Sequence, residues 1–336
     1  MIEATIGRIA SGEDLSFDEM SDAVEAIMTG KCQEQEIGLL LTGLRMKGES
    51  VSEIAGAAAT LRRHMTTLQT SRDDVLDTCG TGGDRLGTFN ISTAAALVTA
   101  AAGVPVAKHG NRAASSKSGS SDVLTELGVN VDADLDCVRR CLDELGICFC
   151  FAPLYHAAMR HVAPVRQKLG VPTIFNLLGP LANPAAAKRQ LIGVAFAAYR
   201  PLVAEAAAML GTQQATVVCG ADGIDEVSIT GPTEVSHLVN GAVGDLTWQP
   251  RDFGLSEGAL DALMVDSPAA SAAMIRDVLA GQVGPPRDIV IANAAAALWT
   301  AGSVDGLEAG ATRAAEAIDT GTARELLERL AEWTRR

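Results

Sequence analysis

Residues 75–107, VLDTCGTGGDRLGTFNISTAAALVTAAAGVPVA, decide the fold class because they change from strand to helix and back to strand. Short β-type runs at 75–78 and 104–107 flank an alanine-rich helical stretch at 93–102. The pattern continues with predicted strands at 147–151, 191–196, 215–219 and 289–291 and predicted helices at 123–127, 135–145, 202–210 and 292–301. This alternation predicts an α/β domain around a mainly parallel sheet, whose ligands bind at the carboxyl ends of the strands.

The N-terminal region, in contrast, has only helical signals. Two capping boxes, SFDE at 16–19 and SVSE at 50–53, predict helix starts. Four apolar residues recur at the spacing of one helical face, namely Ile37, Leu40, Leu41 and Leu44. We therefore predict a small all-helical domain at 1–72 and a larger α/β domain at 73–336. Residues 231–288, with several Gly and Pro breaks, predict no definite element.

Composition excludes several function classes. Lys plus Arg is 27 and Asp plus Glu is 41, a net charge of −14, so the chain as a whole repels nucleic acid and anionic membranes. The 12 aromatic residues (Trp 3, Tyr 2, Phe 7) are too few for a base-stacking surface. The seven cysteines form no CxxC pair, which favours buried thiols in a reducing compartment. Residues 1–10 lack a signal-peptide core and 91–107 is weakly apolar, so we expect a soluble, cytoplasmic protein.

A glycine loop, DTCGTGGD at 77–84, follows the first predicted strand. It is not a dinucleotide fingerprint, because the third glycine would fall at Arg85, and no Gly-Lys-Ser/Thr of a P-loop follows. Alone it is either a tight strand–helix turn or a ligand loop. The next segment, 87–93, places hydroxyl and amide side chains at the start of a helix, where free N–H groups and the helix dipole favour phosphate.

The segment KHGNRAASSKSGSSD at 108–122 adds cations. From Arg85 to Ser121 the chain has no Asp or Glu, but it has Arg85, Lys108, Arg112 and Lys117. Serine hydroxyls add donors that suit phosphate. A solvated flexible loop is the alternative, but it leaves the exclusion of acids unexplained. The three segments together predict a site for a polyanion.

These segments resemble the anthranilate phosphoribosyltransferase family. The motifs that carry the resemblance follow in the family's order: GTGGD (80–84), NIST (90–93), KHGNR (108–112), FAPLYH (151–156), VRQKLG (165–170), FNLLGPLANP (175–184) and DGIDE (222–226). They span essentially the whole chain after the helical start. Departures such as Cys79, Cys148 and Cys150 exchange small or apolar residues.

The resemblance implies a fold like that of nucleoside phosphorylases, with the active site between the two domains and a chain that returns to the helical domain around 165–190. It implies transfer of the phosphoribosyl group of phosphoribosyl pyrophosphate (PRPP) to the amine of anthranilate in tryptophan biosynthesis, through an oxocarbenium-like state. It also implies Mg²⁺, with two ions per site, and a homodimer formed through the helical domain.

The family's site residues carry over position by position. The implied PRPP contacts are Gly80, Gly83, Asp84, Thr88, Asn90, Ile91, Ser92, Thr93, Lys108, His109, Gly110, Asn111, Arg112, Ala113, Ala114, Ser115, Ser116 and Ser120. Residues 110–116 are expected to form a mobile loop. The implied anthranilate contacts are Gly80, His109, Asn111, Arg166 and Pro180, and the implied metal ligands are Ser92, Asp225 and Glu226. No residue is assigned as a general base. We expect His156 to pack and His161 to be solvated, without forming a metal pair.

Two other functions remain as alternatives. A pyrimidine nucleoside phosphorylase has a similar fold and a similar KHGNR loop, but the NIST segment, the FNLLGP segment and the Asp225–Glu226 pair argue against it. A non-catalytic relative that binds nucleic acid is disfavoured by the charge of −14.

Overall fold

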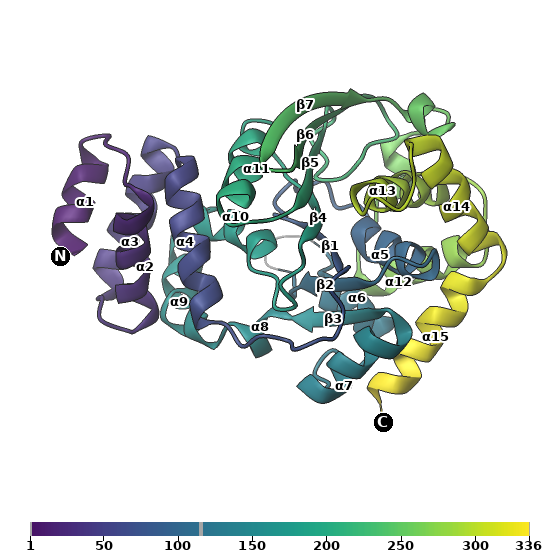
Figure 1. Cartoon of the computed structure of the whole chain (residues 1–336), viewed down its shortest axis with the longest axis horizontal. Coiled ribbons are helices and arrows are strands. Elements are labelled where there is room, and N and C mark those ends of the chain that lie inside the picture. The colour runs from purple at the N-terminus through teal and green to yellow at the C-terminus, as the bar shows by residue number, and fades with distance from the viewer. Residues whose placement is uncertain (1, 114–116, 336) are drawn as a thin grey trace.

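The computed structural model describes residues 2–113 and 117–335. Four helices form one end of the molecule (Figure 1): α1 (Ile2–Ala10), α2 (Phe17–Met28), α3 (Glu34–Lys47) and α4 (Val51–His64). Both predicted capping boxes are confirmed, since the Ser16 and Ser50 side chains accept from the amides of Glu19 and Glu53. The predicted apolar face of α3 is buried at all four positions.

A later segment returns to these helices. α9 (Ala163–Leu169) packs against α3, and α10 (Ile174–Leu181) packs against α3 and α4. Their buried side chains share one apolar core with the N-terminal helices, and this core continues into α11 (Tyr199–Met209) and the sheet. The helical layer is therefore fixed to the sheet by continuous packing.

The sheet has the order β3-β2-β1-β4-β5-β6-β7. Five strands are parallel: β1 (Leu76–Gly80), β2 (Val106–Gly110), β3 (Ile147–Phe151), β4 (Arg189–Gly193) and β5 (Gln214–Gly220). The predicted mainly parallel sheet is thus confirmed, although β4 ends at Gly193 rather than at 196. Gly80 of β1 pairs with Gly193 of β4, so these strands end side by side. The strand order reverses between β1 and β4, which is where α/β sheets open a crevice for ligands.

Two parts of the chain differ from the sequence prediction. Residues 289–291 were predicted as a strand, but they lie in α13 (Pro285–Thr300), whose buried residues cover most of its circumference. A short apolar run has no periodicity that separates a strand from a buried helix. Residues 231–288, predicted without an element, hold β6 (Thr233–Val239), β7 (Ala242–Trp248) and α12 (Pro268–Leu279). Asn240 and Gly241, with φ of 51° and 80°, turn β6 into β7, and Asn-Gly is a strong hairpin signal.

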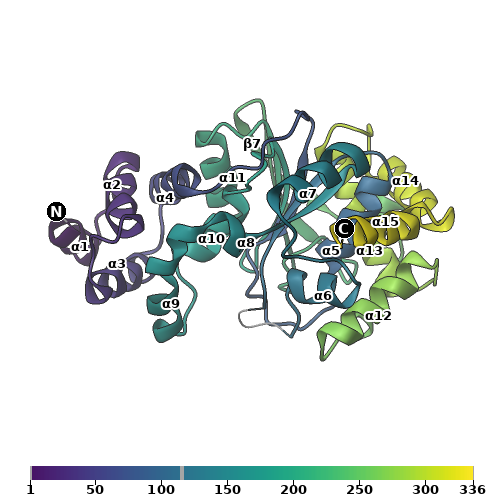
Figure 2. The same ribbon diagram turned by 90° about the horizontal axis from the view of Figure 1, so that it is seen from below.

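Helices cover both faces of the sheet (Figures 1 and 2). α10 and α11 pack on one face, and α5 (Ile91–Ala101) and α13 pack on the other. The remaining helices are α6 (Ser120–Glu126), α7 (Leu135–Arg140), α8 (Ala152–Tyr155), α14 (Leu307–Asp319) and α15 (Thr322–Thr334). The seven cysteines are free thiols, and Cys148 and Cys150 lie on one buried face of β3. No helix within the described ranges is long and apolar enough to cross a membrane.

Candidate active site

The glycine loop lies at the crevice between β1 and β4. Gly82 and Gly83 have φ of 65° and 94°, in the left-handed region that favours glycine. Gly193, at the end of β4, allows the closest approach: a Cβ there would lie 1.6 Å from the carbonyl oxygen of Asp225. The loop after β5 therefore packs directly on the ends of β1 and β4, and it brings Asp225 beside the glycine loop.

Three carboxyl groups meet at this point. The Asp225 carboxylate accepts a 3.0 Å hydrogen bond from the Gly82 amide, and Asp84 lies near enough to raise its pKa. Glu226 accepts a 3.0 Å hydrogen bond from the Ser92 amide. Burial raises the pKa of Asp225 and of Glu226 well above the ordinary range, and the neighbouring acidic groups raise both pKa values further.

One buried cation accompanies the carboxyl groups. Lys108 is 4% exposed, and its Nζ donates to the carbonyl oxygen of Thr78 and, over 3.1 Å, to Ser92 Oγ. Its charge lowers the pKa of Glu226, but by less than burial raises it. The cluster therefore has more acidic groups than cations, although its carboxyl groups are only half-buried.

This donor set fits Mg²⁺. The carboxylates and the Ser92 hydroxyl are hard oxygen donors, and a divalent cation would offset their crowded negative charge. Within residues 2–113 and 117–335 no three His, Cys, Asp or Glu side chains are arranged as a ready metal cage. The protein would thus supply only part of a coordination shell, as is usual where substrate phosphates and water supply the rest.

The backbone amides at the start of α5 differ from the sequence prediction. The amides predicted to be free for phosphate already have acceptors: Ile91 donates to Phe89, Ser92 to Glu226, and Thr93 to Asn90. The prediction of free N–H groups is wrong because the chain's own carbonyl and carboxylate groups occupy this helix end. Ile91 and Thr93 are each 1% exposed, so their side chains are not presented to the crevice, whereas Ser92 is half-buried.

The end of β2 holds a buried histidine pair. His109 Nδ1 donates to the carbonyl oxygen of Gly179 over 3.1 Å, beside Pro180, so its Nε2 is left to accept from His156 Nε2, 3.2 Å away. Burial lowers the pKa of His109 to about 3 and that of His156 to about 4, so both rings are neutral at neutral pH. The predicted packing of His156 is confirmed. His161, predicted to be solvated, is instead half-buried.

The loop after β2 is closed at its base. The Ser120 hydroxyl donates to the carbonyl oxygen of Asn111 over 3.2 Å, above Gly110. The amides of Ala113 and Gly119 both donate to Asp122, at 2.9 and 3.0 Å. The Arg112 guanidinium lies 5.6 Å from the ring centroid of Phe151. Ala114, Ser115 and Ser116 lie outside the described residues.

Arg166 belongs to α9, in the helical layer. Its Nη2 donates to Asn176 over 3.3 Å, and its guanidinium lies 5.8 Å from the ring centroid of Phe175. Burial lowers its pKa. In the described part of the chain no carboxylate lies within ion-pair distance of it, so its charge is available to an acidic ligand.

Three residues at the site were not predicted from the sequence: Gly193, Asn293 and Ser271. Asn293, on α13, accepts from the Val227 amide and donates to its carbonyl oxygen, both at 2.9 Å, and so holds the segment next to Glu226. The sequence pattern did not identify Asn293, because the prediction divided α13 into a strand at 289–291 and a separate helix at 292–301. Ser271 lies within 231–288, where the sequence predicts no definite element.

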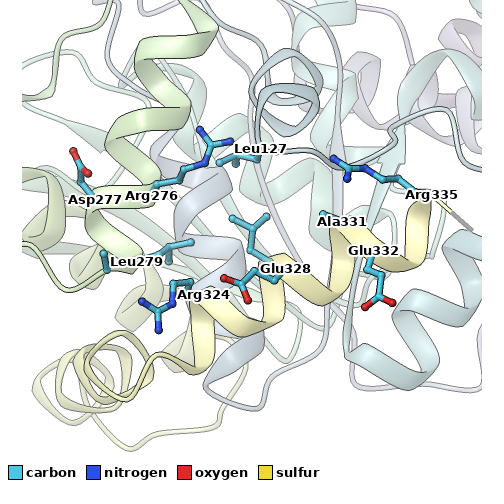
Figure 3. Close-up of a pocket in the computed structure, with 11 residues that line it drawn as sticks. Leu127, Arg276, Asp277, Leu279, Arg324, Glu328, Ala331, Glu332 and Arg335 are labelled. Atoms are coloured by element: carbon cyan, nitrogen blue, oxygen red, sulfur yellow. The ribbon is translucent and has the colours of Figure 1, made fainter.

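A cavity of about 790 Å³ lies between α12 and α15, away from the crevice (Figure 3). Leu127, Leu279 and Leu327 line it together with exposed Arg and Glu side chains. None of the predicted site residues lines this cavity, so it is separate from the crevice between β1 and β4.

Comparison with known proteins agrees with this architecture. Residues 4–65 match the helical bundle domain of a glycosyl transferase family, and residues 72–324 match its a/b domain. The chain is 50% identical over 330 residues to the anthranilate phosphoribosyltransferase of Anaeromyxobacter sp. (strain K), covering 98% of both chains.

Solved structures agree as well. The anthranilate phosphoribosyltransferase of Thermus thermophilus matches with a TM-score of 0.92 and 40% identity, over 98% of this chain and 99% of that one. The Saccharomyces cerevisiae enzyme in complex with PRPP and Mg matches with a TM-score of 0.91 and 30% identity, over 99% and 98%. The same yeast enzyme with 4-fluoroanthranilate matches with a TM-score of 0.89 and 28% identity, again over 99% and 98%. The chain therefore belongs to this glycosyl transferase family and, within it, to the anthranilate phosphoribosyltransferases.

Proposed function

We propose that this chain transfers the 5-phosphoribosyl group of PRPP to the amine of anthranilate, giving N-(5-phosphoribosyl)anthranilate and pyrophosphate in tryptophan biosynthesis. The observation that carries the proposal is the cluster of half-buried Asp225 and Glu226 with buried Lys108 beside the glycine loop. Its hard oxygens suit a divalent cation, and the nearby hydroxyls and cations suit a polyphosphate.

PRPP would lie along the ends of β1 and β2. The glycine loop would supply close backbone approach, and Thr88, Ser92 and Lys108 would supply polar donors. Asn90 would support this surface. The further proposed contacts are Gly80, Gly83, Asp84, His109, Gly110, Asn111, Arg112, Ala113, Ala114, Ser115, Ser116 and Ser120, whereas Ile91 and Thr93 would only hold the start of α5 in place. Because the first amides of α5 are already bonded, PRPP must rely on side chains and the helix dipole there.

Ser92, Asp225 and Glu226 would hold Mg²⁺, which we propose is present as two ions per site. Mg²⁺, when bound, supplies positive charge to the pyrophosphate group. The yeast relative in complex with PRPP and Mg supports the choice of metal.

Anthranilate would approach from the helical layer. Arg166 would meet its carboxylate with two parallel hydrogen bonds, and Asn111 would lie at the amine. Gly80, His109 and Pro180 would line its path, and the neutral His109 ring would present no charge to the aromatic ring. An aromatic amine attacks as the neutral species, so the site needs alignment of the amine rather than a strong base. The anomeric carbon would pass through an oxocarbenium-like state.

The direct test uses the fluorescence of anthranilate. Its loss on mixing with PRPP, Mg²⁺ and protein, and not when PRPP or Mg²⁺ is omitted, is the expected result. Phosphorolysis of thymidine or uridine in place of this reaction would instead support a nucleoside phosphorylase, and salt-dependent DNA binding would support a nucleic-acid-binding protein.

The protein is further proposed to be a cytoplasmic homodimer that associates through its helical domain. Leu39 and Met46, seven residues apart on α3, are 60% and 83% exposed, which suits an apolar contact between copies. Light scattering of the parent and of Leu39→Glu/Met46→Glu tests this, with a dimer expected only for the parent. The domain boundary after residue 72 stays a prediction.

A further inference from the structure

Ser271 connects α12 to the proposed PRPP site. Its side chain is fully buried, and α12 packs against α6, which begins at Ser120 (Figure 2). The Ser271 hydroxyl donates to Asn90 Oδ1 over 2.8 Å and accepts from the Asn90 backbone amide over 3.0 Å. These two bonds fix both the backbone and the side chain of Asn90.

Asn90 is shared with a second serine. The Ser118 hydroxyl donates to Asn90 Oδ1 over 2.7 Å, and Asn90 Nδ2 donates to the Ser118 carbonyl oxygen over 3.1 Å. Both lone pairs of Oδ1 and one N–H of Nδ2 are therefore used within the protein. Asn90 can offer only one remaining N–H to a ligand. Its main role is to join two segments of the site to α12.

The joined segments both face the proposed substrate. Asn90 directly precedes the start of α5, where Ser92 contacts Lys108. Ser118 is next to Gly119, whose amide shares the Asp122 carboxylate with the amide of Ala113. A displacement of Asn90 would therefore shift the base of the loop and the start of α5 together.

We propose that Ser271 is a positioning residue for PRPP binding, which acts through Asn90 and touches no substrate itself. This inference rests on the proposed function, because it assigns the positioned surface to PRPP. Without the hydroxyl, Asn90 loses one donor to its Oδ1 and its part-buried backbone N–H loses its acceptor, so its orientation is no longer fixed.

The test measures PRPP binding by calorimetry in the presence of Mg²⁺ and absence of anthranilate, followed by steady-state kinetics. Ser271→Ala is expected to weaken PRPP binding about three- to tenfold, the effect of losing one or two neutral hydrogen bonds. The KM for anthranilate should change by less than about twofold, since that substrate is bound elsewhere. Ser271→Cys, which keeps a weaker donor and acceptor, should lie between Ser271→Ala and the parent.

Ser267→Ala is the matched control. Ser267 caps the same helix, and its hydroxyl accepts from the Ala270 amide, but it has no contact with Asn90. It should lower thermal stability without changing PRPP affinity. If Ser271 acts through Asn90, Ser271→Ala should weaken PRPP binding less in the Asn90→Ala background than in the parent, because the bond to Asn90 Oδ1 is already lost there and only the bond from the backbone amide of residue 90 remains.

Parent-like PRPP affinity in Ser271→Ala, or full additivity in the double variant, would overturn the inference. A parent that binds PRPP but does not consume anthranilate would overturn the proposed function alone. A parent that binds no PRPP would overturn both.

Discussion

The carboxylate of Glu226 accepts a 3.0 Å hydrogen bond from the backbone amide of Ser92, and so joins the loop after β5 to the start of α5. The protein thus places its own half-buried carboxylate where a helix would otherwise bind an external anion. Burial and the neighbouring Asp225 both disfavour the charged form of Glu226, so that form needs a nearby cation. A bound cation would relieve that cost, which is why the site is suited to a metal–phosphate ligand rather than to a bare anion.

The first prediction concerns the acidic pair. Asp225→Asn with Glu226→Gln should raise the Mg²⁺ concentration for half-maximal activity by at least about tenfold. Two of the three proposed Mg²⁺ ligands would then be uncharged amides instead of carboxylates. Thermal stability without Mg²⁺ should be equal to or higher than the parent's, because two desolvated carboxyl groups become neutral. Activity titrated with Mg²⁺ and thermal unfolding measure the two effects.

Asp222→Asn is the control for this pair. Asp222 lies in the same loop, but its carboxylate accepts hydrogen bonds from Ser228 and Thr230 rather than facing the glycine loop. It should leave the Mg²⁺ dependence unchanged. A parent-like Mg²⁺ dependence in the doubly neutralised variant would remove the pair from the metal site.

The second prediction concerns the close approach at Gly193. Gly193→Ala would place a Cβ 1.6 Å from the Asp225 carbonyl oxygen, so the loop after β5 must move away. We expect a loss of about 1–3 kcal/mol in the free energy of unfolding. The fall in kcat/KM should be on the order of a hundredfold, because the carboxyl groups are displaced. Denaturant unfolding and steady-state kinetics provide the two values.

Gly244→Ala serves as its control. Gly244 also lies in a strand, β7, but a Cβ there would meet no atom within 4 Å. It should be nearly neutral in both measurements. Wild-type activity in Gly193→Ala would show that the position of the Asp225 loop is not needed.

The third prediction is a pH dependence of stability that arises from the buried histidines. Burial lowers the pKa of His109 to about 3 and that of His156 to about 4, below the ordinary value of about 6.5. Between these pH values the unfolded chain binds a proton at each ring and the folded chain does not. Each ring therefore lowers the free energy of unfolding as the pH falls below about 6.5. Burial also raises the pKa of Asp77 to about 6, and this carboxyl acts in the opposite direction.

The comparison of variants isolates the histidines, since the carboxyl groups are common to all of them. Urea unfolding at about pH 7 and about pH 5.5 should show that His109→Asn/His156→Asn loses about 2.5 kcal/mol less stability over this interval than the parent does. His161→Asn is the control for the loss of a histidine outside the pair. An identical pH dependence in the parent and the double variant would mean that the rings titrate normally in the folded protein.

The sequence predicted the parts of the site that depend on local pattern. The glycine loop, the acid-free segment and the Asp225–Glu226 pair lie in short contiguous runs, and five strands of the sheet could be recognised from their apolar runs. Contacts between distant segments left no such pattern. Asn293 is one polar residue in an alanine-rich helix, and its partner Val227 becomes its neighbour only after α13 packs on the sheet. The bond from the Ser92 amide to Glu226 likewise joins segments 134 residues apart, and it occupies one of the amides that the helix start predicted to be free.

The last prediction concerns Arg166. Anthranilate is a small planar acid, so most of its directional binding must come through its carboxylate. A charge-assisted hydrogen bond contributes about 1.5–3 kcal/mol, so Arg166→Ala should raise the KM for anthranilate on the order of ten- to a hundredfold. The KM for PRPP should change little, because the proposed PRPP contacts lie at the sheet edge rather than on α9. Arg166→Lys should recover only part of the loss, because an ammonium cannot form two parallel bonds.

Lys168→Ala is the matched control for Arg166, since Lys168 lies on the same helix but pairs with Glu34 on the surface. It should leave both KM values unchanged. Arg166 also donates to Asn176, so a purely structural role would disturb α10 and affect both substrates equally. Equal losses for PRPP and anthranilate would therefore assign Arg166 to packing, and an unchanged anthranilate KM would remove it from the site. A selective loss for anthranilate, partly restored by lysine, is the result that places its guanidinium on the substrate carboxylate.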